Sequence, residues 1–352
     1  MKMHVICVEP AQYTLDLLKN IYGETSITFL HSNSKAVWTS DASIANAYYC
    51  DNNSWLQNLC HFIQIGLNNR FIISNGYTHW SFQLLYLMSF FKKMHIGIES
   101  DTPYSEKVGV KKIIKTLYLG SVFSNKAILG LSGGNGAHMD LFLKYGMDKH
   151  RIFLLPMMID NLKYFRPEKR DSNKSFSFLC VGRLIPEKNI EMLLDAFKNK
   201  FMNSNTQLII VGSGMCEDAL KNRSDSAENI VFKGKLIGEE LITCYHHADV
   251  LVLPSVSEKW GLVVNEALAS RLAVLCSNAV GAASDLVIKP DAGWVFNTGN
   301  QDELERLLIH CVEHREEVEE KAKNGLAFMK NNWSYKNYQH SLDEIKNYVT
   351  TH

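Results

Sequence analysis

Short apolar runs alternate with longer amphipathic stretches along the chain, and this alternation predicts parallel α/β layers. The stretch Asn189–Lys200 is an amphipathic example, because its apolar residues at 190, 193, 194 and 197 form one face at helical spacing. The strands expected in the first half are His4–Val8, Ile27–Leu30, Phe71–Ser74, Ile96–Glu99 and Ile152–Pro156. Those expected in the second half are Phe176–Val181, Gln207–Val211, Ile230–Lys233, Val250–Leu253 and Ala273–Ser277.

The order of these elements fits two domains of ordinary size, and 352 residues are enough to build them. Pro167 and a cluster of Lys, Asp and Ser mark residues 165–175 as the interdomain linker. We therefore expect one domain over residues 1–165, a second over residues 166–332 and a helix over residues 333–352.

Composition narrows the class of protein. Hydrophobic residues make up 46% of the chain and charged residues 21%, which is typical of a globular soluble protein. The net charge is zero, so nucleic acid is not an expected partner. The N-terminus lacks the pattern of a signal peptide, and the longest apolar stretch, Phe82–Phe91, is too short to span a bilayer. The expected location is the cytoplasm.

Two glutamates in the run PSVSEKWGLVVNEALAS carry the strongest functional signal. A predicted strand ends at Pro254 and a helix begins near Leu262, so Glu258 lies in the connecting loop and Glu266 lies inside the helix. Free N–H groups of the first helical turn, at Gly261, Leu262 and Val263, favour a bound anion. Carboxylates beside a phosphate site are good acceptors for hydroxyl groups. A nucleotide sugar has both kinds of group.

The motif sequence resembles that of the family-4 retaining glycosyltransferases, also called group 1 glycosyl transferases, which have the GT-B fold. The matching segments, in the expected order, are Phe178–Arg183 with Pro186–Lys188, Leu208–Gly214, Val231–Gly234, Ala248–Ser255 and the Glu258–Glu266 run. The resemblance covers roughly residues 150–300, in the C-terminal half. It implies an α/β protein with two facing Rossmann-like domains and a cleft between them. The first domain would be the acceptor side, the second would bind the nucleotide sugar, and the C-terminal helix would pack back on the first.

The resemblance also assigns roles in the second domain. Arg183 and Lys188 would stabilise the departing diphosphate without a metal, Glu266 would hold the ribose, and Glu258 would contact the transferred sugar. Further donor-site candidates are Gly182, Gly212, Gly214, Lys235, Leu236 and Ser255. Alternatives remain open for three of them. Gly212 and Gly214 also fit an ordinary strand-to-helix turn, and Ser255 also fits a helix-capping or loop serine.

In the first domain, Glu99 and Asp101 end a predicted strand where related enzymes place a His or carboxylate facing the sugar. A simple polar turn before Pro103 explains them equally well. Gly134 and His138 belong to the glycine-rich run SGGNGAH, which could line the cleft or form a flexible loop.

No cofactor is expected, because the chain lacks a D-x-D, an H-E-x-x-H and a cysteine cluster. His246 and His247 are neighbours on a predicted helix and point about 100° apart, so we interpret them as surface or packing residues. The basic, amphipathic stretch 107–119 could place Lys111, Lys112 and Lys115 on lipid headgroups. A core-packed helix with a solvated face is the preferred interpretation, unless the acceptor is linked to a lipid.

The sequence therefore predicts a glycosyltransferase (a metal-independent retaining hexosyltransferase). It would move a hexose or N-acetylhexosamine from a nucleoside-diphosphate sugar, UDP being preferred to GDP, to a saccharide or lipid-linked saccharide. Family habits suggest bacterial surface polysaccharide or O-antigen synthesis, at the cytoplasmic face of the membrane. The alternatives are a GT-B-type epimerase or hydrolase of the nucleotide sugar, and a non-catalytic nucleotide-sugar-binding protein.

Overall fold

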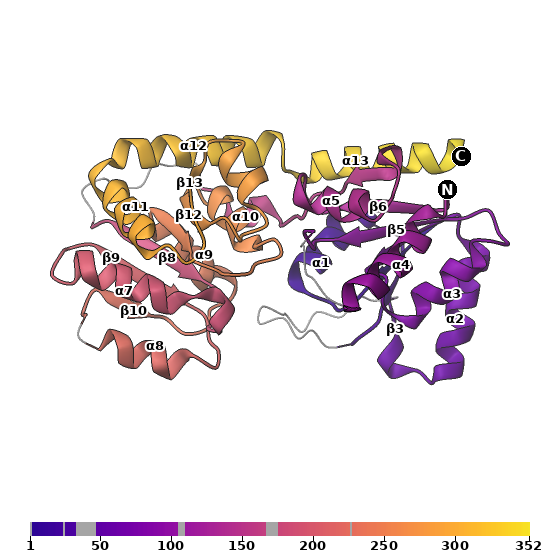
Figure 1. Cartoon of the computed structure of the whole chain (residues 1–352), viewed down its shortest axis with the longest axis horizontal. Coiled ribbons are helices and arrows are strands. Elements are labelled where there is room, and N and C mark those ends of the chain that lie inside the picture. Colours follow the sequence, from indigo (N-terminus) through magenta and orange to yellow (C-terminus); the bar gives the residue numbers. More distant parts are fainter. Residues whose placement is uncertain (1, 24, 33–46, 105–109, 167–174, 226) are drawn as a thin grey trace. The chain divides into compact units, whose positions relative to one another are not determined.

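The computed structural model of the chain describes residues 2–23, 25–32, 47–104, 110–166, 175–225 and 227–352 (Figure 1). The chain divides into two compact units. One contains residues 1–158 and 335–352, and the other contains residues 159–334. The first division lies a few residues before the predicted boundary at 165, and most of the predicted linker, residues 167–174, lies outside the described residues.

The first unit is built on a parallel sheet with the strand order β3-β2-β1-β4-β5-β6-β7. These strands are β1 (Met3–Cys7), β2 (Ser26–Phe29), β3 (Tyr48–Tyr49), β4 (Phe71–Asn75), β5 (His95–Ser100), β6 (Ile128–Ser132) and β7 (Ile152–Leu154). Its helices include α1 (Gln12–Leu17), α2 (Trp55–Asn68), α3 (Trp80–Met88), α4 (Val110–Ser124) and α5 (Ala137–Lys144). Right-handed crossovers in this strand order place α2, α3 and α4 on one face of the sheet and α1 on the other.

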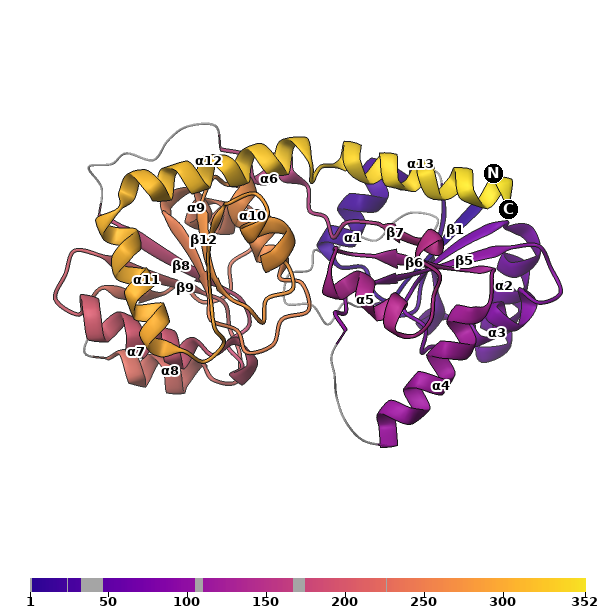
Figure 2. The same cartoon turned by 45° about the horizontal axis from the view of Figure 1, so that its top comes forward.

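Helix α13 (Tyr335–Thr351) completes the first unit, although it is the last element of the chain. It packs against β7, and the hydroxyl of Tyr338 is 2.7 Å from that of Tyr22. Leu342, Ile345 and Val349 are buried. In Figures 1 and 2, α13 runs along the first unit with the C-terminus at its end.

The second unit is built on a parallel sheet with the order β10-β9-β8-β11-β12-β13. The strands are β8 (Ser177–Val181), β9 (Gln207–Val211), β10 (Ile230–Phe232), β11 (Val250–Leu253), β12 (Ala273–Ser277) and β13 (Gly293–Phe296). Its helices include α6 (Asn161–Tyr164), α7 (Ile190–Phe201), α8 (Glu217–Ser224), α9 (Gly238–His247), α10 (Leu262–Ala269), α11 (Gln301–Glu313) and α12 (Arg315–Asn331). Both units are therefore Rossmann-like, which confirms the predicted fold class in that respect.

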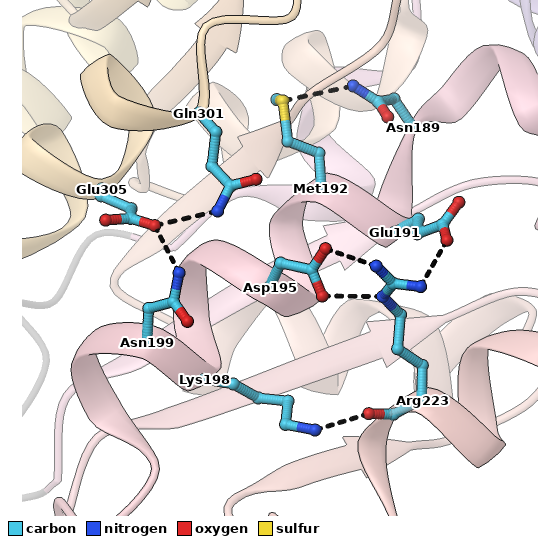
Figure 3. Close-up of polar contacts among 9 residues, drawn as sticks. All are labelled: Asn189, Glu191, Met192, Asp195, Lys198, Asn199, Arg223, Gln301 and Glu305. Carbon is cyan, nitrogen blue, oxygen red and sulfur yellow. Dashed lines mark hydrogen bonds and ion pairs between the residues drawn. The ribbon is translucent and has the colours of Figure 1, made fainter.

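Helix α7 is held in place from both sides (Figure 3). Its predicted apolar face is buried at Ile190, Leu193, Leu194 and Phe197. On its polar side, Arg223 of α8 forms ion pairs with Glu191 and Asp195, and Asn199 donates to Glu305 of α11. The fixed helix sets the position of the loop before it, which carries Lys188.

The stretch predicted to be basic and amphipathic is helical from Val110 onward, while residues 107–109 and the side chains of residues 110–112 lie outside the described part. The interpretation that its apolar residues pack inward is wrong for three of them. Ile113, Ile114 and Leu117 have exposed fractions of 60%, 63% and 71%. In the part of the chain that the structure describes, no helix is long and apolar enough to cross a membrane.

Candidate functional site

The predicted donor-site residues lie in loops at the carboxyl ends of four neighbouring strands, β10, β9, β8 and β11, and in α10, which follows β11. The structure brings two of these residues into direct contact, because the Lys188 ammonium forms an ion pair with the Glu258 carboxylate. The exposed fractions of these side chains are 14% and 18%, so the pair is largely shielded from water. The carboxyl ends of parallel strands are where α/β proteins bind ligands.

The loop that carries Glu258 is braced by its backbone and by an aromatic stack. The backbone of Glu258 forms a parallel β-bridge with Val280. The Glu258 N–H donates to the Ala279 carbonyl, and the Gly281 N–H donates to the Glu258 carbonyl. Trp260 is buried, donates its indole N–H to Asn265 at 2.9 Å and stacks on Trp333. The tryptophan of the motif therefore supports the loop, and the two glutamates remain for other roles.

Two cations of different character lie in the loop after β8. The Arg183 side chain is exposed, whereas Lys188 is half-buried. Burial lowers the pKa of Lys188, and nearby Arg183 acts in the same direction. Cys180 and Glu187 act in the opposite direction and raise the pKa. Both positions suit the stabilisation of an anion at this edge.

Gly212 and Gly214 are required by the contact between two loops. A Cβ atom at Gly212 would overlap the carbonyl of Gly182, and one at Gly214 would overlap the backbone of Leu184. The loops are also joined by the hydrogen bond from the Leu184 N–H to the Ser213 carbonyl, at 2.9 Å. This contact supplies a structural reason for the glycines, and a contact with the ligand stays a prediction.

Helix α10 begins as predicted, with Gly261 as its N-cap residue. Gly261 has φ = 95°, a conformation that favours glycine, and an added Cβ would press on Glu258 and Val280. Leu262 and Val263 form the first turn and are half-buried. Their N–H groups point from the start of the helix, where the helix dipole favours an anion.

Glu266 is held by two tyrosines that the sequence interpretation missed. Tyr164 of α6 donates to one carboxylate oxygen at 3.1 Å, and Tyr245 of α9 donates to the other at 2.5 Å. Burial raises the pKa of Glu266 to about 7, while both hydrogen bonds act to lower it. Each carboxylate oxygen has a second lone pair, so the group can still accept from a ligand hydroxyl. No spacing rule links residues 164 and 245 to 266.

The remaining donor candidates differ in exposure. Ser255 is fully buried, and its hydroxyl has no hydrogen-bond partner among the described residues. It does not cap α10, so the helix-capping alternative is wrong for that helix. Lys235 is exposed and Leu236 is half-buried in the loop after β10.

In the first unit, the ends of β5 and β6 carry the other candidates. Asn75 donates to the Glu99 carboxylate at 2.6 Å. Burial raises the pKa of Glu99 to about 7, the hydrogen bond from Asn75 lowers it, and Asp101 raises it further. Asp101 follows β5 and accepts a weak hydrogen bond from Thr102 at 3.4 Å. Asn75 is a second residue that sequence patterns did not single out.

The glycine-rich run lies beside Glu99 and Asp101, because the Gly133 N–H donates to the Ser100 carbonyl at 2.9 Å. Gly134 is buried, and its carbonyl accepts from the Ser132 hydroxyl. His138 is also buried, with an exposed fraction of 2%, in the first turn of α5. Burial of this kind is less suited to a ligand contact than to packing.

No group of three or more His, Cys, Asp or Glu side chains among the described residues could hold a metal ion. The two predicted packing histidines bond to backbone carbonyls, His246 to Tyr164 and His247 to Thr243. A cavity of about 650 Å³ lies elsewhere, at the amino ends of β1 and β2, with His4 and His61 in its lining. It is at the opposite edge of the first sheet from Glu99.

Two Rossmann-like domains, with loops of this composition at the carboxyl edge of the second, define a protein of the GT-B class. Residues 163–327 match the family described as glycosyl transferases group 1. The match confirms the resemblance carried by the Gly-Arg and Glu–Glu motifs.

Relatives and solved structures agree with this assignment. The chain is 31% identical over 172 residues to the lipopolysaccharide 1,2-N-acetylglucosaminetransferase of Salmonella typhimurium, covering 44% of each chain. It is 34% identical over 147 residues to a GDP-mannose-dependent alpha-mannosyltransferase of Mycobacterium tuberculosis, covering 42% of this chain and 35% of that one. The chain thus spans less than half the length of these relatives.

The crystal structure of Anabaena HepE in complex with UDP has the same fold. The TM-score is 0.78, at 16% sequence identity, and the alignment covers 99% of this chain and 100% of that chain. At this identity the likeness shows the fold alone.

Proposed function

We propose that the protein is a retaining glycosyltransferase that moves a hexose or N-acetylhexosamine from a nucleoside-diphosphate sugar to a saccharide acceptor. The observation that carries the proposal is the contact between Lys188 and Glu258, with Arg183 in the same loop and Glu266 one helix turn beyond the N-terminus of α10. Cations and a helix N-terminus for the diphosphate thus lie beside carboxylates for hydroxyl groups.

In this proposal the diphosphate takes Glu258's place beside Lys188. Arg183 and Lys188 then stabilise the charge that gathers on the leaving group, which is where fixed charges accelerate a reaction. Glu258, once released, accepts hydrogen bonds from the transferred sugar. Glu266, oriented by Tyr164 and Tyr245, accepts from the ribose.

The donor is a UDP-sugar in preference to a GDP-sugar. UDP is the nucleotide in the HepE complex, and an N-acetylglucosaminetransferase is among the relatives, whereas the mycobacterial relative is named for GDP-mannose. Lys235 and Leu236 would lie beside the base. The absence of a D-x-D motif supports catalysis without a metal ion.

The acceptor is a saccharide or a lipid-linked saccharide in bacterial surface polysaccharide or O-antigen synthesis, at the inner face of the membrane. The lipopolysaccharide transferase among the relatives supports this setting. Glu99 or Asp101 would face the sugar, with His138 and Gly134 as further candidates. Membrane contact through residues 107–119 belongs to the same proposal.

A turnover assay tests the proposal against its alternatives. UDP- and GDP-linked hexoses and N-acetylhexosamines are incubated with and without saccharide acceptors, in the presence of excess EDTA. Release of the diphosphate only with acceptor, and a product with the anomeric configuration of the donor by NMR, are expected. Release without acceptor would favour a hydrolase, a changed donor would favour an epimerase, and binding without turnover would favour a non-catalytic protein.

A further inference from the structure

Helices α2, α3 and α4 of the first unit expose apolar side chains that a soluble domain usually buries. Six of them define what is here called the apolar face. Leu56 and Leu67 lie on α2, Phe90 and Phe91 just after α3, and Ile114 and Leu117 on α4. Their exposed fractions range from 58% for Leu67 to 92% for Phe91. Elsewhere in the described residues, large exposed apolar side chains are scattered singly over many elements.

The three helices cover the same face of the first sheet, and each contacts the next. Phe62 of α2 packs edge-on against Trp80 of α3, with ring centroids 5.3 Å apart. Gln83 of α3 donates to Tyr118 of α4 at 2.9 Å. Figures 1 and 2 both show α2 and α3 side by side.

The charge of this region has one sign. Residues 52–98 and 107–139, which include the three helices, contain no Asp or Glu, although the whole chain has 37. The same two ranges contain eight Lys and Arg residues. Of these, Arg70, Lys93 and Lys126 are exposed just before β4, β5 and β6, which are neighbouring strands. The cations therefore follow one edge of the sheet, beside the carboxyl ends of the helices.

We propose that the apolar face docks on an anionic lipid bilayer, with Phe90 and Phe91 inserted at the interface and Arg70, Lys93 and Lys126 on the headgroups. Apolar side chains rimmed by cations are what a peripheral membrane surface requires. A second copy of the chain is disfavoured as the occupant, since a symmetric contact would place the same positive charges against each other. The inference extends the proposed membrane contact from one helix to three, and it holds whether or not the acceptor is lipid-linked.

Vesicle co-sedimentation of the full chain tests this proposal. Vesicles of phosphatidylcholine alone are compared with vesicles that also contain phosphatidylglycerol, at low and high salt. The wild-type protein should bind the anionic vesicles preferentially. The double variant Phe90→Ser with Phe91→Ser should bind about tenfold more weakly. Arg70→Gln with Lys93→Gln, which removes two positive charges, should bind about 25-fold more weakly at low salt, from about fivefold for each cation near the surface, and the loss should shrink at high salt.

The matched control is Met215→Ser with Ile288→Ser, which removes two apolar side chains of the second unit that are 85% and 62% exposed. It should bind vesicles like the wild-type protein. An equal loss in this control, equal binding to neutral and anionic vesicles, or no vesicle binding would overturn the proposal. So would a stable dimer that dissociates in the Phe90/Phe91 variant, seen by light scattering. Calorimetric UDP binding, measured on every variant, reports separately on the donor site.

Discussion

Removing the charge of Glu258 should strengthen the binding of a bare nucleoside diphosphate. In the empty site Glu258 neutralises Lys188, and the diphosphate has to displace it. Glu258→Gln leaves the ammonium available and removes a carboxylate that repels the ligand. We therefore expect the diphosphate to bind more tightly and the sugar to be transferred more slowly.

The size of the effect follows from the shielding of the pair. Two unit charges about 4 Å apart interact by roughly 4 kcal/mol at an effective dielectric constant of about 20. Hydration of the released ammonium offsets much of this energy, because both side chains retain some exposure. A net gain of about 1–2 kcal/mol remains, which corresponds to a roughly 5- to 30-fold lower Kd.

Calorimetric titration with UDP and GDP measures the Kd of the diphosphate, and initial rates with the full donor measure sugar transfer. Glu187→Gln is the matched control, since Glu187 is exposed and precedes Lys188 directly. It should change the Kd by less than about twofold, as surface charges do. Weaker diphosphate binding by Glu258→Gln, or the same Kd as for Glu187→Gln, would refute the reasoning.

Three further predictions concern the same domain. Arg183→Ala should lower turnover at least about 100-fold, which corresponds to a barrier higher by about 2.7 kcal/mol. The Tm should not change, because the Arg183 side chain is exposed. A near-normal rate of the folded variant would show that Arg183 has no part in the mechanism. The pKa of Glu266 is raised to about 7, so the carboxylate forms as the pH rises through 7, and UDP affinity should increase between about pH 6 and 8. The raised pKa also means that ionisation of Glu266 costs folding stability as the pH rises from about 4.5 to 7. Glu266→Gln should lose the pH dependence of UDP affinity, measured by calorimetry, and that of stability, measured by urea unfolding. A variant that keeps these dependences would show that another group titrates. Gly214→Ala should lower the stability of the second unit by about 1–3 kcal/mol in urea unfolding, since its Cβ meets the backbone of Leu184. The control Gly120→Ala in α4, where a Cβ has room, should leave stability unchanged. Equal stability of the two variants would contradict the steric argument.

Sequence patterns located the strands well where apolar residues are continuous. Gln207–Val211, Val250–Leu253 and Ala273–Ser277 are strands with the predicted bounds. Strands β3, β6 and β13 were missed, and β3 has only two residues. A glycine, which is depleted in strands, weakens the local signal of β6 and β13, although β5 was predicted despite Gly97. Gly130 of β6 packs against Phe142, and a Cβ at Gly293 of β13 would overlap the backbone of Val274. Tertiary packing, not local preference, therefore decides these two strands.

The order of motifs along the chain was enough to place Glu258 in a loop and Glu266 in a helix. It could not show that Lys188 and Glu258, 70 residues apart, form an ion pair. Nor could it find Tyr164, which reaches Glu266 from 102 residues away. These contacts depend on the directions of side chains from separate elements, and local patterns contain no information about them.

The N-terminal domain is assembled from two pieces of chain, with the whole second domain inserted between residues 158 and 335. On the ribosome, Leu342, Ile345 and Val349 emerge after every residue of the inserted domain. The first sheet must therefore remain uncovered over the area of α13 while the second domain, which is continuous in sequence, completes its core. Domains generally fold from the N-terminus during synthesis, whereas in this chain the domain that is synthesised first is the last to be finished.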